Sequence, residues 1–383
     1  MSPHVFLVAG EESGDRLGAA LIAAIKRHSP GARFSGVGGA HMAQEGVPSL
    51  FALGDLAIMG FSAIPARLPK ILRRIRETAD AVVVAKPDVL VIIDSPEFTH
   101  RVARRVRAIA PQIPIVDYVC PSVWAWRPGR ARAMRAYVDH VLALLPFEPA
   151  AMQKLNGPAC SFVGHPLSEQ VARLRPNAEE AQRRLGEPPI LLVMPGSRSG
   201  EIQRMAATFG KAATLVSQHI AGLQVVVPAV PRLADMVREA VKQWRVPVRV
   251  VTAPEEKDAA FRIARAALTK SGTSTLELAV AGVPMVAGYK VSLLEEAVGR
   301  LMVKVPSIIL ANLVLGDKAV PELVQRDCTP ERLAAALLPL MSDTPERRRQ
   351  IAALARLDAI MEIGVAVPSD RATAMVLNCV RRP

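Results

Sequence analysis

Aromatic residues and cysteines are scarce in this sequence, and long apolar runs are absent. Aromatic side chains make up 4% of the 383 residues, so the core is expected to be aliphatic. The cysteines, Cys120, Cys160, Cys328 and Cys379, are widely spaced and form no CxxC pair. This spacing argues against a zinc site and against a disulfide framework, and it suits a reducing cytoplasm.

No stretch approaches the roughly 18 uninterrupted apolar residues that a membrane-spanning helix needs. The apolar run after Met1 is also shorter than the core of a signal peptide, and no basic region precedes it. Any membrane contact is therefore expected to be peripheral.

The overall composition is that of a globular protein with an excess of basic residues. Hydrophobic residues make up 50% and charged residues 22% of the chain, which excludes a disordered protein. Lys and Arg number 48 against 35 Asp and Glu, giving a net charge of +13. This excess favours polyanions, anionic membrane surfaces or phosphorylated substrates, without distinguishing among them. The length predicts two domains, at about 100 to 200 residues each.

Short apolar runs alternate with helical patterns, which is typical of βα units on parallel sheets. In the first half the expected strands are VFLVAG, ARFSGVG, DVLVIID, IPIVDYV, HVLALLPF and CSFVGHP. A linker is expected around HPLSEQVARLRPNAEE, and the strands resume with ILLVMPGS, LQVVVPAV, VRVVT, AALTKSG and PMVAGY. The helix after the first strand is expected to bury Leu17, Leu21, Ala24 and Ile25, with Ser13 as its N-cap.

The predicted fold class is therefore α/β, with two doubly wound parallel-sheet domains and a helical C-terminal tail. We place the first domain at residues 1–168, the second at 169–342 and the tail at 343–383, packed back on the first domain. The pattern becomes wholly helical from about Thr329. Ligands of such sheets bind beyond the carboxyl ends of the strands, so an interdomain cleft is predicted to hold the site.

One loop of the second domain suggests an anion site. In LLVMPGSRSGEI a strand ends in a turn containing Gly196 and Ser197, followed by Arg198 and a helix start. Exposed amides, the helix dipole and a guanidinium all favour an anion, with phosphate as the obvious candidate. The alternative is that Arg198 only pairs with Glu201 on a solvated surface.

A second loop in the same domain strengthens the case. The strand in LTKSGTSTLELAV leads into Ser271, Gly272 and Thr273, and then into a helix that carries Glu277. Small residues at a helix start let a phosphate approach the backbone, and Glu277 is placed to reach a ribose diol. Ordinary helix capping is the alternative for these residues. The two loops together favour a nucleotide.

Several common motifs are missing, and their absence narrows the chemistry. No GK[ST] follows the glycines, so a Walker A element is excluded, and the GxGxxG fingerprint of dinucleotide binding is absent. No Asp-x-Asp pair is present to hold a metal on a diphosphate. Positive charge on a diphosphate would have to come from the protein itself, and no metal is expected.

The first domain supplies a candidate general base. The apolar strand in DVLVIIDSPEF ends on Asp94, with Glu97 three residues later. A carboxylate at this edge of the sheet is placed to accept a proton from an attacking hydroxyl. The alternative is an aspartate that caps the next helix.

Two further stretches suggest a surface for a bulky or apolar ligand. The segment VCPSVWAWRPGR holds Trp124, Trp126 and Arg127, which favour a ligand or partner, with core packing as the alternative. An apolar loop and a basic helix follow one another in IMGFSAIPARLPKILRRIRETA. Their predicted acceptor-binding and membrane-facing residues are Met59, Phe61, Ile64, Arg67, Lys70, Arg73 and Arg74. The helix also carries an apolar face, expected to pack on its domain, of Leu68, Ile71, Leu72, Ile75 and Ala79.

Taken in order, these motifs resemble the lipid A disaccharide synthases, a family of glycosyltransferases of the GT-B type. The resemblance runs through VAGEESGDRLGA, FSGVGGAHM, KPDVLVIIDSPEF, YVCPSVWAWR, FVGHPL, MPGSRSGEI, KSGTSTLE, PMVAGYK, NLVLG and PELVQ. It covers most of the chain, linker included. So many ordered motifs are far more specific than any single one.

The resemblance implies two Rossmann-like domains and an inverting, metal-independent enzyme without a cofactor. Such an enzyme joins UDP-2,3-diacylglucosamine to 2,3-diacylglucosamine 1-phosphate, giving the β-1′,6-linked disaccharide and UDP. By this likeness Asp94 activates the acceptor hydroxyl and Arg198 binds the donor diphosphate. The serine-glycine-threonine turn and Glu277 match the nucleotide side, and Asn312 lines the same cleft. The resemblance also implies a cytoplasmic enzyme peripheral to the inner membrane of a Gram-negative bacterium, and a dimer that exchanges C-terminal helices.

Three positions depart from the family pattern. Ala63 stands where an acidic residue is frequent, Cys120 replaces a serine, and Glu97 replaces an aspartate. If the carboxylate at this position helps catalysis in relatives, this chain works without it. Two rival functions remain: another UDP-sugar enzyme of this architecture, such as a muramyl-type transferase or an epimerase, and a basic nucleic-acid-binding module. The second finds no helix-turn-helix, RNA-recognition or zinc pattern, so no nucleic-acid partner is expected.

Overall fold

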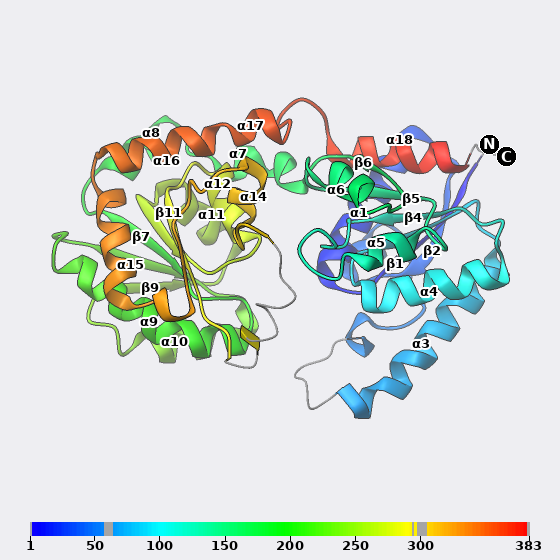
Figure 1. Ribbon diagram of the computed structural model, residues 1–383, viewed down its shortest axis with the longest axis horizontal. Helices are drawn as coiled ribbons and strands as arrows, with labels where there is room; N and C mark the ends of the chain where they lie inside the picture. Colours follow the sequence, from blue (N-terminus) through cyan, green and yellow to red (C-terminus); the bar gives the residue numbers. More distant parts are fainter. Residues whose placement is uncertain (1, 57–63, 293–294, 297–304, 381–383) are drawn as a thin grey trace. The chain divides into compact units, whose positions relative to one another are not determined.

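The computed structural model describes residues 2–56, 64–292, 295–296 and 305–380, and the side chains of residues 64–67 lie outside the description. The chain divides into two compact units (Figure 1). Unit 1 comprises Met1–Pro166 and Val365–Pro383, and unit 2 comprises Leu167–Gly364. No helix in the described ranges is long and apolar enough to cross a membrane.

Unit 1 is built on a parallel sheet in the order β2-β1-β3-β4-β5-β6. Its strands are β1 (His4–Ala9), β2 (Arg33–Val37), β3 (Val89–Ile93), β4 (Ile115–Tyr118), β5 (His140–Ala143) and β6 (Ala159–Phe162). All six were predicted from their apolar runs, and β1 and β3 are buried along their whole length. The strand order reverses between β1 and β3, and the carboxyl edge at such a switch point is where these sheets bind ligands.

The helices of unit 1 cover both faces of this sheet (Figure 1). They are α1 (Glu12–His28), α2 (Ala40–Gln44), α3 (Ile64–Ala85), α4 (Pro96–Ile109), α5 (Gly129–Met134), α6 (Glu148–Lys154) and α18 (Pro368–Val380). As predicted, α1 buries Leu17, Leu21, Ala24 and Ile25. The prediction of Ser13 as its N-cap was wrong, because the helix begins at Glu12 and the Ser13 hydroxyl bonds Asp94 instead.

Unit 2 repeats the architecture in the order β12-β11-β10-β7-β8-β9. Its strands are β7 (Ile190–Met194), β8 (Gln224–Pro228), β9 (Val248–Val251), β10 (Ala266–Thr269), β11 (Met285–Tyr289) and β12 (Glu322–Val324). Five were predicted, and the short edge strand β12 was missed. The order reverses between the neighbouring strands β7 and β10, which are the two strands that the predicted phosphate loops follow.

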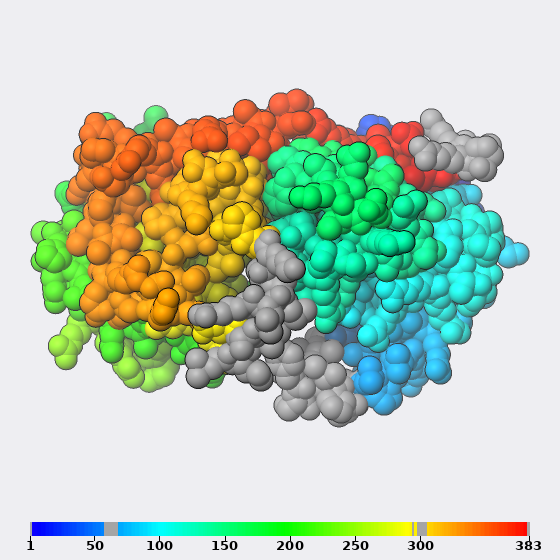
Figure 2. Space-filling view, viewed as in Figure 1, coloured from blue at the N-terminus to red at the C-terminus, as the bar shows by residue number. Residues whose placement is uncertain are grey.

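The helices of unit 2 include the segment that was expected to be a linker. They are α7 (Val171–Leu174), α8 (Ala178–Leu185), α9 (Ser199–Ser217), α10 (Ala234–Val241), α11 (Pro254–Ile263), α12 (Ser274–Val280), α14 (Leu310–Leu315), α15 (Pro330–Leu337), α16 (Pro345–Ala355) and α17 (Leu357–Ile360). In the space-filling view α15 and α16 form part of the surface of this unit, in orange (Figure 2).

Residues 343–383 were expected to pack on the first domain, but the structure assigns the part up to Gly364 to unit 2. Helix α16 packs within unit 2, where the buried Gln350 side chain donates to the carbonyl of Met285 at 3.0 Å and accepts from its amide at 2.6 Å. These bonds fix α16 to the start of β11. Among the described helices of the tail, only α18 packs in unit 1, against α1, where Arg27 and Asp370 form an ion pair of 2.7 Å. Exchange of tail helices between subunits stays a prediction.

Candidate functional site

Asp94 follows β3 at the switch point of unit 1, in a constrained backbone. Asp94 and Ser95 both adopt left-handed backbone conformations, with φ of 54° and 45°. The Asp94 carboxylate accepts hydrogen bonds from the Ser13 hydroxyl at 2.9 Å and from the Ser95 amide at 2.8 Å. A side chain on Gly10 would place its Cβ 2.5 Å from the Cβ of Ser95, so glycine is needed for this close approach. The half-buried carboxylate is therefore held in one orientation.

These contacts do not match the alternative interpretation of Asp94 as a helix cap. Ser95 is the N-cap residue of α4, and α4 has no side-chain cap. Thr99 on the first turn of α4 donates its hydroxyl to the main-chain carbonyl of Asp94 at 2.6 Å. The helix therefore positions the Asp94 backbone and leaves its carboxylate to Ser13 and the Ser95 amide.

A buried acid on the neighbouring strand was missed in the sequence. Asp117 on β4 is 1% exposed, and its carboxylate lies 3.1 Å from His100 Nε2 of α4. His100 Nδ1 in turn lies 3.1 Å from the hydroxyl of Tyr137. Burial raises the pKa of Asp117, and the charge of His100 opposes that rise. An aspartate inside the apolar run IPIVDYV was the signal that could have revealed it.

The tryptophan segment of unit 1 is held by two carboxylates. Arg130 donates to Glu97 at 2.5 Å and lowers the pKa of that carboxyl. The guanidinium of Arg127 lies over the ring of Trp126, 4.4 Å from its centroid. Trp124 donates from Nε1 to the buried Glu148 at 3.1 Å. Of the residues predicted to face an acceptor, Trp124 and Trp126 are thus half-buried and Arg127 is exposed, and all three have partners within the unit.

In unit 2 the arginine loop leaves β7 and turns on Gly196. Gly196 has a φ of 148°, and a Cβ there would lie 2.4 Å from the Cβ of Glu201. The carboxylate of Glu201 accepts from the amides of Ser197 at 2.9 Å and Arg198 at 3.2 Å. The Arg198 side chain is 77% exposed, and its Nη1 lies 3.6 Å from Glu201. The predicted anion site therefore has a free guanidinium face, but these two amides are already occupied.

The turn after β10 differs in this respect. In the described part of the chain, no residue accepts a hydrogen bond from the amides of Gly272 or Thr273. Gly272 has a φ of 145°, which favours glycine, and the Ser271 hydroxyl donates to the carbonyl of Ile308 at 2.6 Å. The amides of Gly272 and Thr273 are therefore open, whereas those of Ser197 and Arg198 in the arginine loop are occupied by Glu201.

The two other predicted nucleotide residues are engaged within unit 2. Lys257 of α11 donates to both oxygens of Glu277, at 3.0 and 3.2 Å. Asn312 is 2% exposed, and its amide group donates to the carbonyl of Val320 and to Glu322, both at 2.9 Å. Any effect of Asn312 on a ligand would thus pass through residues 320–322.

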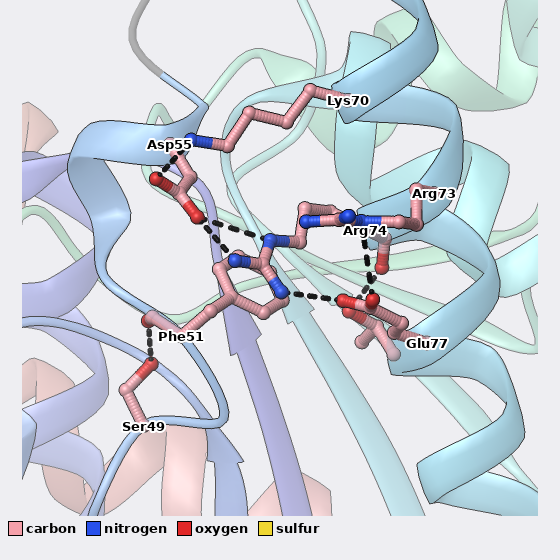
Figure 3. A network of polar contacts seen from close by, with 8 residues as sticks. Ser49, Phe51, Asp55, Lys70, Arg73, Arg74 and Glu77 are labelled. Atoms are coloured by element: carbon pink, nitrogen blue, oxygen red, sulfur yellow. Dashed lines mark hydrogen bonds and ion pairs between the residues drawn. The ribbon is translucent and has the colours of Figure 1, made fainter.

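The basic helix α3 is less free than the sequence predicted. Asp55 accepts from Lys70 at 2.6 Å and from Arg74 at 2.5 and 3.0 Å, and these bonds lower the pKa of Asp55 (Figure 3). The Arg74 guanidinium also lies over the ring of Phe51, at 4.6 Å. Arg73 and Arg74 both contact Glu77. Two carboxylates therefore offset two of these three basic charges.

The apolar face of α3 is also partly uncovered. Ile75 and Ala79 are buried as predicted. The prediction that Leu68 and Leu72 pack on the domain was wrong, because they are 41% and 39% exposed. Met59 and Phe61, the side chains of Ile64 and Arg67, and the departure at Ala63 lie outside the described residues.

Comparison with known proteins gives consistent results over nearly the whole chain. The family model described as lipid-A-disaccharide synthetase matches residues 5–367. A lipid-A-disaccharide synthase of Nitrobacter hamburgensis is 57% identical over 378 residues, which cover 98% of this chain and 96% of that protein. One of Rhodopseudomonas palustris is 56% identical over 380 residues, covering 99% and 97%.

Solved structures share the fold at low sequence identity. A UDP-GlcNAc 2-epimerase of Neisseria meningitidis, bound to UDP-GlcNAc, matches with a TM-score of 0.65 and 13% identity, covering 98% of this chain and 100% of that one. MurG of Acinetobacter baumannii matches with a TM-score of 0.60 and 16% identity, covering 98% and 99%. Together with the two six-stranded sheets, these matches confirm the predicted α/β fold class of the GT-B type.

Proposed function

The chain belongs to the lipid-A-disaccharide synthetase family, and from this membership we propose how its residues carry out the reaction. It is a glycosyltransferase of lipid A biosynthesis. The donor is UDP-2,3-diacylglucosamine and the acceptor is 2,3-diacylglucosamine 1-phosphate. The acceptor's 6-hydroxyl attacks the anomeric carbon of the donor, the bond from that carbon to the diphosphate breaks, and UDP leaves. One bond is made from the face opposite the leaving group, so the configuration inverts.

The observation that carries the proposal is the fixed carboxylate of Asp94 at the switch point of unit 1. Its bonds to Ser13 and to the Ser95 amide orient it without neutralising it, since neither donor is a cation. A carboxylate held this way is suited to accept the proton of the attacking hydroxyl as the new bond forms. Asp117 and His100 support the strand and helix that carry it.

Unit 2 binds the nucleotide in this proposal. UDP leaves with negative charge gathering on its β-phosphate, and fixed donors stabilise that charge in the transition state. The exposed guanidinium of Arg198 and the open amides of Gly272 and Thr273 are such donors, on loops that follow the adjacent strands β7 and β10. Gly196, Ser197 and Ser271 shape these loops, Glu277 binds the ribose, and Asn312 acts indirectly through residues 320–322.

The lipid chains and the anionic membrane surface are assigned to unit 1. The exposed Leu68 and Leu72 of α3, with the exposed Arg73 beside them, combine apolar area with positive charge, as a peripheral membrane helix requires. The enzyme would work at the cytoplasmic side of the inner membrane of a Gram-negative bacterium. Met59, Phe61, Ile64, Arg67, Lys70, Arg74, Trp124, Trp126 and Arg127 complete the proposed acceptor and membrane face.

The rival function, a UDP-sugar enzyme with soluble substrates, shares the fold but is not favoured. The epimerase and MurG matches are 13% and 16% identical, whereas the lipid-A-disaccharide synthases reach 57%. The deciding experiment measures UDP release by the purified protein from the diacylated donor and from unacylated UDP-GlcNAc, each with and without the diacylated acceptor. Acceptor-dependent release is expected. Release only from unacylated UDP-GlcNAc would favour the rival, and no release from either donor would refute both.

A further inference from the structure

Glu201 is a buried carboxylate that holds the arginine loop by its backbone. It is 4% exposed, and one of its oxygens accepts from the amides of both Ser197 and Arg198. Burial alone would raise the pKa of Glu201. Lys270, the Ser197 amide and Arg198 outweigh burial and lower it, so the group is ionised. The loop that carries Arg198 is thus tied to a fixed negative charge at the start of α9.

Lys270 connects the same carboxylate to the second loop. It is the first residue after β10, its side chain is 15% exposed, and its Nζ donates to the other oxygen of Glu201 at 3.0 Å. The Lys270 Nζ would also lie 3.2 Å from a Cβ on Gly272, so the ammonium lies directly against the turn that holds the open amides. One buried ion pair therefore joins the two loops that leave β7 and β10.

A helix cap alone would not produce this arrangement. Glu201 is the third residue of α9, and a glutamate there commonly accepts from the N-cap amide. Glu180 of α8 occupies the same position in an ordinary capping box, with Arg262 as its cation partner at 2.7 Å. Arg262 joins α11 to α8 and touches neither loop. The pair of Glu201 with Lys270 differs because it bridges two loops at the switch point of the sheet.

We propose that Glu201 and Lys270 are positioning residues for donor binding: their ion pair sets the Arg198 guanidinium in register with the amides of the turn after β10. This inference rests on the proposed function, because it takes the ligand of the two loops to be the diphosphate of a UDP-sugar. Neither residue takes part in the chemistry. Both act by fixing the distance between the two groups of donors.

The test exploits the opposite charges of the two residues. If the two residues acted on UDP only through their charges, Glu201→Gln would tighten UDP binding, because it removes a negative charge, and Lys270→Met would weaken it. Loss of position instead weakens UDP binding in both variants, by about tenfold to a hundredfold, since small misplacements of binding groups are costly. Glu180→Gln is the matched control, because it breaks an equivalent capping pair in the same unit. The dissociation constant of UDP is measured by calorimetry, and thermal unfolding checks that each variant is folded.

Two further measurements separate positioning from general damage. The KM for the donor should rise in both variants, while the KM for the acceptor stays within about twofold. Exchange of the Ser197 and Arg198 amides with deuterium should be faster in Lys270→Met than in the wild type, and Lys270→Arg should restore both slow exchange and UDP affinity. These Lys270 variants decide the question by themselves if Glu201→Gln does not fold.

Tighter or unchanged UDP binding by a folded Glu201→Gln would overturn the proposal, as would equal losses in Glu180→Gln. Unchanged amide exchange in Lys270→Met would do the same. Failure of the proposed function gives a different result: the intact protein would bind UDP but release none from the acylated donor. The binding comparison would then still decide the role of the pair.

Discussion

The hydroxyl of Ser13 lies 2.9 Å from Oδ2 of Asp94, so a residue of α1 orients the carboxylate that follows β3. Ser13 lies in the helix that follows β1, and Asp94 directly follows β3, and the order of the unit 1 sheet reverses between these two strands. Because Ser13 donates to the carboxylate, it fixes one oxygen and leaves lone pairs on both for a substrate proton. The contact thus links the topology of the sheet to the proposed proton transfer.

Asp94→Asn is therefore expected to lower turnover by about 10²- to 10⁴-fold, because the amide cannot accept the proton of the attacking hydroxyl. Ser13→Ala should have a smaller effect, about tenfold, since it loosens the carboxylate without removing it. Asp80→Asn, on the exposed Asp80 of α3, is the control and should keep normal turnover. UDP release at saturating donor and acceptor is the measurement. Normal turnover in Asp94→Asn would remove the proposed base.

Arg198→Ala is expected to reduce turnover by about 10²- to 10³-fold, since it removes the proposed donor to the departing diphosphate. Its side chain is 77% exposed, so the free energy of unfolding should change by less than about 0.5 kcal/mol. Arg238→Ala on α10, where the arginine is 53% exposed and also pairs with an acid three residues away, is the matched control. Turnover and the dissociation constant of UDP are compared in both variants. Equal effects in the two variants would contradict a specific role for Arg198.

Replacing Leu68 and Leu72 together by glutamine should weaken binding to vesicles that contain anionic lipid. The two side chains are 41% and 39% exposed, so they lose apolar contact with lipid but little packing within the protein. Leu185→Gln, on a leucine of unit 2 that is 67% exposed, is the control. Co-sedimentation with vesicles of mixed neutral and anionic lipid measures the loss, which should be at least about tenfold. Unchanged binding would show that these two leucines of α3 do not bind the membrane.

The sequence was sufficient for the sheets but not for the contacts that complete the site. In the described ranges, eleven strands were predicted from runs rich in apolar residues, whereas β12 was missed because it is only three residues long and lies at an edge. The sequence places Gly196 and Arg198 in a loop after β7. It does not reveal that Glu201 accepts from the amides of that loop, because this contact depends on how the turn folds. Leu68 and Leu72 continue a helical apolar pattern, and periodicity alone does not reveal what covers a face.

Buried polar groups were the hardest to foresee. Asp117 was missed inside the apolar run IPIVDYV, and Asn312 was expected to line the ligand cleft. In the structure one pairs with His100 and the other bonds Val320 and Glu322, because a buried polar group needs partners from distant segments. Patterns of single residues do not encode those partners. The same applies to Gln350, whose bonds to β11 keep α16 in unit 2.

Glu148 provides a test through pH. Burial raises the pKa of Glu148 to about 7, against the bonds from the Leu145 amide, Trp124 and the Leu144 amide, which lower it. The folded protein thus binds this proton more tightly than the unfolded chain, whose carboxyl has an ordinary pKa of 4.5. Stability from this group is therefore fully present below about pH 4.5 and is lost as the pH rises to about 7.

The amide of Glu148→Gln cannot titrate, so the free energy of unfolding of this variant does not fall with rising pH on account of residue 148. The wild type should lose stability relative to the variant by up to about 1.4 kcal/mol per pH unit between about pH 5 and 7, and by nothing further above that. Taking the difference cancels the titration of the histidines, which both proteins share. Denaturant unfolding followed by tryptophan fluorescence at several pH values gives the two curves. Glu239→Gln, on a glutamate that is 72% exposed, should show no such trend. A constant difference between the wild type and Glu148→Gln across this range would mean that Glu148 is ionised throughout, and that its three donors outweigh the cost of burial.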